Sequence, residues 1–238
     1  MLEQEKLNDK TTTALIIGAG TGLSASIARL FAAEGMAIAL GARQVDKLSA
    51  LSQEIGAFSF TCDASKPDEV NELFNQVEQK LGVPTVVVYN PSLRIAGPLI
   101  ELDAIEVAKA LEITAYGGFL VAQAAAKRML KLGSGAIFFT GASASIKGYP
   151  RSAPFAMGKF ALRGLAQSIA RELAPQNIHV AHFVIDGVIR SATRLEPADK
   201  PDSFLDPDAI AQTYLNILRQ PRSAWTYEVE LRPWVEQF

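Results

Sequence analysis

The stretch from residue 12 to residue 31, TTALIIGAGTGLSASIARLF, constrains the fold of this chain more than any other. An apolar, strand-prone run (Ala14–Ile17) precedes a glycine-rich turn (Gly18–Gly22), and apolar residues at helical spacing follow, at Leu23, Ile27, Leu30 and Phe31. This order predicts a strand, a tight turn and a helix that begins at the turn. The unpaired N–H groups and positive dipole at such a helix N-terminus favour a phosphate, and glycines let the backbone approach it. A tight turn without a ligand is the alternative.

Size and composition favour one domain without nucleic-acid or membrane partners. The 238 residues suffice for a single α/β domain over 1–238. A net charge of −2 and a pI near 5.8 do not favour nucleic-acid binding. Because Cys62 is the single cysteine, no internal disulfide forms, and we expect an inert core thiol and a reducing compartment. No apolar run reaches membrane-spanning length and Met1–Lys10 is polar, so we expect a cytoplasmic protein.

Predicted strands and helices alternate along the whole chain. Because the strands are short continuous apolar runs, they are expected to be covered on both faces, as in a parallel sheet between helix layers. The sequence therefore predicts a doubly wound α/β fold with a mostly parallel sheet of about seven strands and helices on both faces. The predicted strands are 14–17, 36–42, 57–62, 83–89, 136–140, 179–185 and 225–231. The first predicted helix begins at residue 23, and the others span 45–55, 67–81, 103–113, 118–132, 154–173 and 207–218.

Residues at the carboxyl ends of the predicted strands are the candidates for function, because ligands of such sheets bind at that edge. They are Gly18, Arg43, Asp63, Asn90, Ser143 and Asp186. Asp63 or Ser65 could also cap the following helix. A turn cap is the expected role of Asp186, and a contact to a bound ligand is the alternative.

This order of elements and these strand ends resemble the short-chain dehydrogenase/reductase family over Thr12–Leu231. The run Gly18-Ala19-Gly20-Thr21-Gly22-Leu23 matches the family's glycine pattern, except that Ser24 replaces its last glycine. The resemblance implies a Rossmann-type fold, hydride transfer with a nicotinamide cofactor, a small-molecule substrate, and dimers or tetramers. The cofactor-binding residues that it implies are Gly18, Gly20, Thr21, Gly22, Leu23, Arg43, Asp63, Ala64, Asn90, Lys159, Gly187 and Val188.

The residue that follows the second predicted strand favours NADP(H) over NAD(H). NAD enzymes of this architecture usually carry a carboxylate there, which binds the ribose hydroxyls. This chain has Arg43, and the next acidic residue is Asp46. A guanidinium suits a 2′-phosphate, which it binds through a fork of charge-assisted hydrogen bonds. An arginine that only meets solvent is the alternative.

The resemblance also implies that the usual proton donor is missing. Phe155 stands at the position of the catalytic Tyr, Ala142 at that of the Ser and Thr114 at that of the Asn. Of the family's four usual catalytic residues, only Lys159 is present. Ser143 is next to Ala142, but neighbours on an extended segment point to opposite sides. The candidate catalytic residues are Lys159, Ser143 and Tyr149, whereas Ser145, Tyr116 and Asp186 are further possible donors.

Two interpretations remain open. In the first, the chain is an oxidoreductase with a displaced or water-supplied acid, and hydride addition to an activated C=C or C=N bond is one reaction that would suit it. In the second, it is a non-catalytic NADP(H)-binding protein that acts as a sensor, scaffold or partner subunit.

Three further expectations concern metals, the region after the sixth strand and the C-terminus. His179 and His182 are three apart on a strand and face opposite ways, and no cluster has ligand spacing, so no metal site is expected. The polar segment at about 189–205 is the expected substrate lid. Large apolar residues near the C-terminus favour a subunit interface; they are Trp225, Trp234, Val235 and Phe238.

Overall fold

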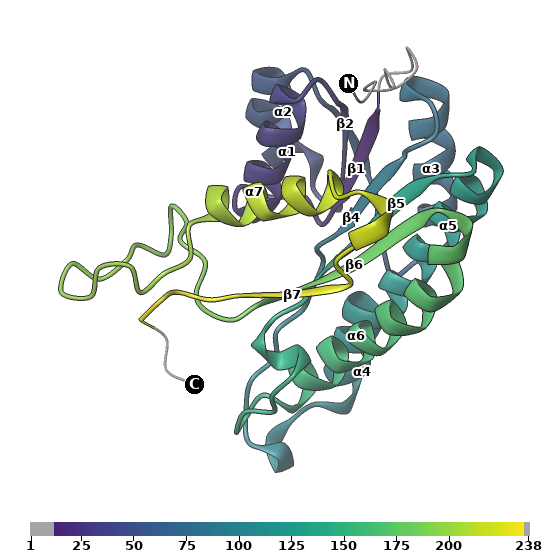
Figure 1. The fold of residues 1–238 in the computed structure, drawn as a ribbon. Helices are drawn as coiled ribbons and strands as arrows, with labels where there is room; N and C mark the ends of the chain where they lie inside the picture. Colours follow the sequence, from purple (N-terminus) through teal and green to yellow (C-terminus); the bar gives the residue numbers. More distant parts are fainter. Residues whose placement is uncertain (1–11, 236–238) are drawn as a thin grey trace.

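A single parallel sheet organises the computed structural model, which describes residues 12–235 (Figure 1). Its seven strands lie in the order β3-β2-β1-β4-β5-β6-β7, and every neighbouring pair is parallel. This confirms the predicted doubly wound sheet. The strands are β1 (Thr13–Ile17), β2 (Ala37–Ala42), β3 (Phe58–Thr61), β4 (Val86–Tyr89), β5 (Gly135–Thr140), β6 (Ile178–Ile185) and β7 (Glu228–Leu231).

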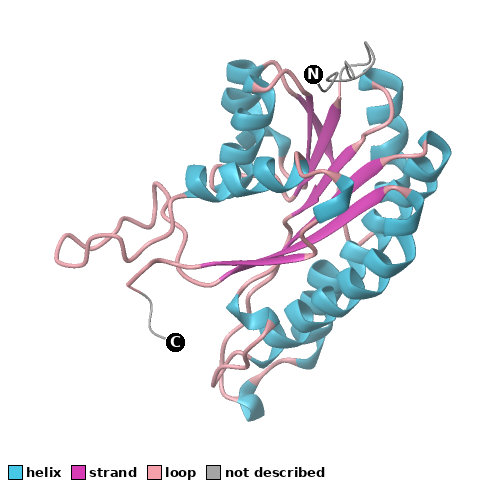
Figure 2. Ribbon diagram, viewed as in Figure 1, coloured by secondary structure: helices cyan, strands magenta, loops and turns pink. Residues whose placement is uncertain are grey.

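Helices cover both faces of the sheet (Figures 1 and 2). Helices α1, α2 and α7 lie on one face, and α3, α4, α5 and α6 lie on the other. Their bounds are α1 (Leu23–Ala33), α2 (Ser49–Ile55), α3 (Pro67–Leu81), α4 (Ala104–Leu111), α5 (Gly117–Leu132), α6 (Ala153–Leu173) and α7 (Pro207–Leu218). In the described part of the chain, no helix is both long and apolar enough to cross a membrane.

The strands read as continuous apolar runs because each one contributes to two cores. Along β1, Ala14 and Ile16 pack in the core beneath α1 and α7, whereas Leu15 and Ile17 pack in the core beneath α3, α5 and α6. All four side chains are almost completely inaccessible to solvent. The period of two along a strand therefore divides a uniform apolar run between two separate cores.

The predicted break between residues 113 and 118 is wrong, because α4 and α5 are joined by a π-helical turn, Glu112–Tyr116. A π turn displaces a carbonyl from the ordinary helical pattern, and here Tyr89 donates a hydrogen bond to the carbonyl oxygen of Ile113. The following glycine, Gly117, allows close packing, since a Cβ there would lie 2.5 Å from the Tyr89 hydroxyl. The side chain of Tyr89 thus fixes a bulge that helical spacing does not reveal.

Several predicted boundaries and caps also need correction. The strands β4 and β7 begin three residues later than predicted, at Val86 and Glu228. Residues 45–48 form a 3₁₀ turn before α2 instead of its first turn. The N-cap of α3 is Lys66, so neither Asp63 nor Ser65 caps that helix. Asp63 instead closes its own turn, where its carboxylate accepts hydrogen bonds from the backbone N–H and hydroxyl of Ser65.

The segment 189–205 extends away from the sheet as a long loop (Figure 2). Its two ends meet at a bridge between Ile189 and Leu205, and Arg190 forms an ion pair with Asp206 at the start of α7. Near the C-terminus, Trp234 donates a hydrogen bond to Asp202 of this loop. The loop therefore leaves and rejoins the sheet at one point beside β6.

Candidate functional site

A cavity of about 710 Å³ opens at the carboxyl edge of β1, β2, β3 and β4. The strand order reverses there between β1 and β4, which is where ligands bind in open parallel sheets. Seven of the predicted cofactor residues line this cavity, namely Gly18, Gly20, Thr21, Arg43, Asp63, Ala64 and Asn90. The other five do not line it; they are Gly22, Leu23, Lys159, Gly187 and Val188.

The glycine-rich turn is locked against the end of β4. Gly18 has a φ of +78°, and a Cβ there would lie 2.6 Å from the backbone nitrogen of Pro91, so this position requires glycine. The carbonyl of Gly18 accepts a hydrogen bond from the Ser24 hydroxyl at 3.1 Å, and that hydroxyl accepts one from Asn90 at 2.7 Å. Ser24 therefore connects the turn to β4.

The start of α1 directly follows the turn residues that line this cavity, and its first backbone N–H groups have no partner within the helix. Its N-cap, Gly22, has no side chain to accept from the first turn, and that turn carries no acidic residue. Gly20 lies outside the left-handed region, and a Cβ on it would meet no atom within 4 Å. Neither the backbone conformation nor the packing of the described residues therefore requires glycine at position 20. The open space beside Gly20 fits a phosphate that approaches the backbone closely.

Positive charge borders the cavity at the end of β2. Arg43 lies there as predicted, and Lys47 lines the same wall. Sequence reasoning missed Lys47, although its spacing of four residues from Arg43 on a helix-like segment was a usable signal. Asp63 is the one carboxylate among the lining residues. Burial opposes its ionisation, but hydrogen bonds from Ser65 and the charge of Arg43 hold the pKa of Asp63 below its usual value.

Cys62 also lines the cavity, as a buried thiol. Burial raises its pKa to about 12, and the nearby carboxylates Glu69 and Asp63 act in the same direction. A thiol with so high a pKa is not a nucleophile at neutral pH. This agrees with the predicted inert side chain.

Lys159 lies on α6 and is only 3% exposed. Its ammonium group donates a hydrogen bond of 2.7 Å to the carbonyl oxygen of Thr140, the last residue of β5. Burial lowers the pKa of Lys159 to about 8. The lysine is thus fixed at the carboxyl end of β5, outside the group of residues that line the cavity.

Phe155 occupies the first turn of α6, one turn before Lys159. The Lys159 ammonium lies 5.9 Å from the centre of its ring. The guanidinium carbon of Arg94, from the segment after β4, lies 5.7 Å from the same centre. Two cations therefore flank this phenyl ring, and sequence reasoning missed Arg94.

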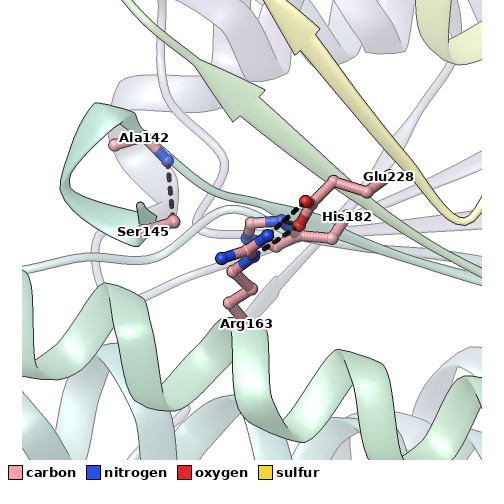
Figure 3. Close-up of polar contacts among 5 residues, drawn as sticks. All are labelled: Ala142, Ser145, Arg163, His182 and Glu228. Carbon is pink, nitrogen blue, oxygen red and sulfur yellow. Dashed lines mark hydrogen bonds and ion pairs between the residues drawn. The ribbon is translucent and has the colours of Figure 1, made fainter. Parts of the chain in front are cut away.

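The candidate hydroxyls lie on the segment that follows β5. This segment is not extended as expected, because Ser143–Ser145 forms a 3₁₀ turn. The Ser145 hydroxyl is fully buried and accepts from the backbone N–H of Ala142 at 3.1 Å (Figure 3). Ala142 is extended as expected, but Ser143 already belongs to the turn, so the extended geometry on which their opposite orientation was predicted ends between these two residues. Tyr149 is 46% exposed, on the loop before α6.

The remaining two candidate donors lie on the π-helical turn and directly after β6. The Tyr116 ring is 45% exposed and stacks on Phe119. The Asp186 carboxylate is buried at the end of β6 and forms ion pairs with Lys147 and Arg232. The expected role of Asp186 as a turn cap is therefore wrong, because its Oδ2 faces both cations and no backbone N–H of the described residues donates to its carboxylate.

The buried His182 of β6 belongs to a polar cluster with Glu228 of β7 and Arg163 of α6 (Figure 3). His182 Nδ1 lies 2.9 Å from Glu228, which also accepts two hydrogen bonds of 2.7 Å from Arg163. Because a carboxylate only accepts, Nδ1 carries a proton, and in the neutral ring Nε2 then carries none. Nε2 is buried and has no hydrogen-bond partner in the described part of the chain. Burial lowers the pKa of His182 to about 4, against the attraction of Glu228.

The two histidines point apart, as predicted. His179 stacks on Trp225 with a ring-centre separation of 4.6 Å and hydrogen-bonds to the Thr226 carbonyl. Trp225 is therefore half-buried against β6 and does not extend a C-terminal apolar patch. Trp234 and Val235 are exposed, at 80% and 40%, whereas Phe238 lies outside the described residues.

Comparison with known proteins gives the class of this protein. The family model for short chain dehydrogenases matches residues 12–200, so the chain belongs to the short-chain dehydrogenase family of oxidoreductases. It is 27% identical over 233 residues to an uncharacterised oxidoreductase of Staphylococcus aureus (strain N315), covering 95% of this chain and 98% of that one.

Solved structures agree in fold. A short-chain dehydrogenase from Rhodopseudomonas palustris is 38% identical, with a TM-score of 0.81 and coverage of 94% of this chain and 99% of that chain. An alcohol dehydrogenase from the archaeon Thermococcus sibiricus, in complex with 5-hydroxy-NADP, is 28% identical, with a TM-score of 0.84 and coverage of 95% and 98%.

The two glycines of the turn should respond differently to an added methyl group. Gly18→Ala forces a side chain onto Pro91 at a positive φ, so we expect it to lower the free energy of unfolding by about 1–3 kcal/mol. Gly20→Ala enters open space, so its stability should stay within about 0.5 kcal/mol of wild type. Urea unfolding of the two matched variants measures this. Equal destabilisation would contradict the difference in packing.

His182 should make stability depend on pH. Its pKa is about 4 in the folded chain and roughly 6.5 when unfolded, so the unfolded chain binds the extra proton between these values. The free energy of unfolding should therefore fall by roughly 3 kcal/mol as pH falls from 6.5 to 4. His182→Asn removes the titrating group, and the difference between the two proteins in urea unfolding at each pH isolates its contribution. Parallel curves for the two proteins would refute this assignment.

Proposed function

We propose that this chain is an NADP(H)-dependent oxidoreductase of the short-chain dehydrogenase/reductase type. It transfers a hydride to or from a small organic substrate and uses a non-standard proton donor. The observation that carries the proposal is the cavity itself, which is lined by the glycine-rich turn before the uncapped start of α1 and by two cations at the end of β2. The relative from Thermococcus sibiricus, solved with 5-hydroxy-NADP, supports a nicotinamide cofactor.

The described residues fit such a cofactor along its length. The start of α1 and the open backbone at Gly20 receive the pyrophosphate. Arg43 and Lys47 bind the 2′-phosphate, because a guanidinium and an ammonium supply charge-assisted donors where an NAD enzyme has a carboxylate. Asp63 lies beside the adenine end.

The remaining predicted cofactor residues act at the nicotinamide end. Asn90 fixes the glycine-rich turn through Ser24, and Lys159 binds the distant ribose from the end of β5. Gly187 and Val188 follow β6 at the same edge of the sheet. When bound, the nicotinamide ring supplies or accepts the hydride, and the protein's part is to hold it against the substrate.

The reaction in this proposal does not use the family's usual acid. Phe155 stands where the catalytic Tyr is expected and carries no proton to donate. Ser143 orients the substrate oxygen, and Tyr149 or a water molecule supplies the proton. Loss of a general acid costs roughly 10²–10⁴ in rate. A substrate in which hydride adds to an activated C=C bond or to a protonated C=N bond tolerates this loss best. The first gives an enolate, which is less basic than an alkoxide and takes its proton from water, and the second gives a neutral amine directly.

We also propose that the chain self-associates. The exposed Trp234 and Val235 leave apolar surface near the end of β7, which a second copy of the chain would cover. This supports a dimer or tetramer, the states that the family resemblance implies.

The cation pair should determine cofactor choice. Arg43→Ala and Lys47→Ala remove contacts that only a 2′-phosphate makes, so each should weaken NADPH binding by about tenfold and leave NADH binding nearly unchanged. Titration by calorimetry or intrinsic fluorescence measures both constants. Arg222→Ala, at an exposed turn after α7, is the matched control for a lost charge. Equal weakening of NADH and NADPH, or no NADPH binding by wild type, would refute the assignment.

A substrate screen should separate an enzyme from a non-catalytic binding protein. We expect NADPH absorbance to fall with enones or imines at least tenfold faster than with simple ketones, because Phe155 cannot protonate an alkoxide. Lys159→Met, which removes the ammonium at the end of β5, should abolish the reaction. If NADPH binds but no compound oxidises it above background, the chain is a sensor, scaffold or partner subunit.

A further inference from the structure

Two cations that have no carboxylate partner among residues 12–235 converge on the ring of Phe155. The hydrogen bond of the Lys159 ammonium goes to a neutral carbonyl, that of Thr140. The guanidinium of Arg94 makes no hydrogen bond or ion pair with any residue from 12 to 235, and its contact is with the Phe155 ring. Each positive group lies within 6 Å of the ring centre, at 5.7 Å and 5.9 Å.

The backbone holds Arg94 in this position, although its side chain is exposed. The N–H of the preceding residue, Leu93, donates to the Thr114 hydroxyl at 3.3 Å. Three residues later, Gly97 donates to the carbonyl of Arg151 at 3.0 Å. The segment that carries Arg94 is therefore tied to the π-helical turn on one side and to the loop before α6 on the other.

This arrangement has positive charge in excess. A buried ammonium without a counter-charge is costly, and an anion that binds nearby offsets that cost. A guanidinium offers a planar fork of donors that matches a carboxylate or phosphate, and it stacks on an aromatic face. The Phe155 ring provides such a face. It also adds no hydroxyl that would compete for the guanidinium donors.

Given the proposed oxidoreductase function, we propose that the substrate carries an oxyanion, a carboxylate or a phosphate, which binds the Arg94 guanidinium above the Phe155 ring. Arg94 makes the direct contact, and the buried charge of Lys159 strengthens it through space. In this role Phe155 supports the cation that selects the substrate. Arg94 is then a specificity-determining residue.

Matched probes of equal shape test this proposal directly. Benzoate and benzamide differ in charge, and phenyl phosphate distinguishes a phosphate preference from a carboxylate preference. We expect wild type to bind benzoate or phenyl phosphate at least tenfold more tightly than benzamide, with the difference falling as salt rises. Calorimetry or ligand-observed NMR gives the dissociation constants, with and without NADPH.

Variants assign the effect to one side chain. Arg94→Met should bring the anion-to-amide ratio close to one, and Arg94→Lys should restore part of it. Arg171→Met, an equal loss of charge near the C-terminal end of α6, should keep the wild-type ratio. A ratio near one in wild type, or an unchanged ratio in Arg94→Met, would overturn the oxyanion site.

The cofactor is titrated separately, so the two proposals fail independently. Arg94→Met should bind NADPH as wild type does, because Arg94 is not among the residues that line the cofactor cavity. Wild type that binds no NADPH refutes the proposed function, whereas the ratio measured on the cofactor-free protein still decides the oxyanion site.

Discussion

The close approach of the β1 exit to the β4 exit determines the geometry of this site. Gly18 lies so near Pro91 that a single methyl group would not fit, and the Ser24 hydroxyl joins the two strand ends through Asn90. The N-terminus of α1 consequently lies beside β1 and β4, where the strand order reverses. Its unpaired N–H groups would otherwise point into solvent.

Local signals in the sequence were sufficient for the fold and for most of the predicted residues that line the cavity. Continuous apolar runs predict parallel strands because each strand must fill two cores, and the glycine-rich turn predicts the start of α1. Arg43 could be found because it directly follows β2. These features depend on neighbours in the sequence, and the order of the strands carries each of them to one edge of the sheet.

Features that depend on distant residues could not be predicted. The π-helical turn exists because Tyr89 donates to the carbonyl of Ile113, and no pattern within residues 103–132 contains that partner. The His182 cluster requires a carboxylate from β7, 46 residues later, and an arginine from α6. The same holds for Arg94, whose position over Phe155 comes from two tied loops.

The neighbourhood of Lys159 connects these unpredicted features to chemistry. A lysine that is 3% exposed and bonded only to a carbonyl keeps its charge at neutral pH with a pKa near 8, so the field around Phe155 is positive. A phenol at position 155 would use that field to ease loss of its own proton. A phenyl ring cannot, and the field then acts on whatever negative charge a ligand brings or develops. In the proposed oxyanion site, a phenyl ring in place of a phenol therefore leaves that field to stabilise a bound anion instead of lowering the pKa of a proton donor.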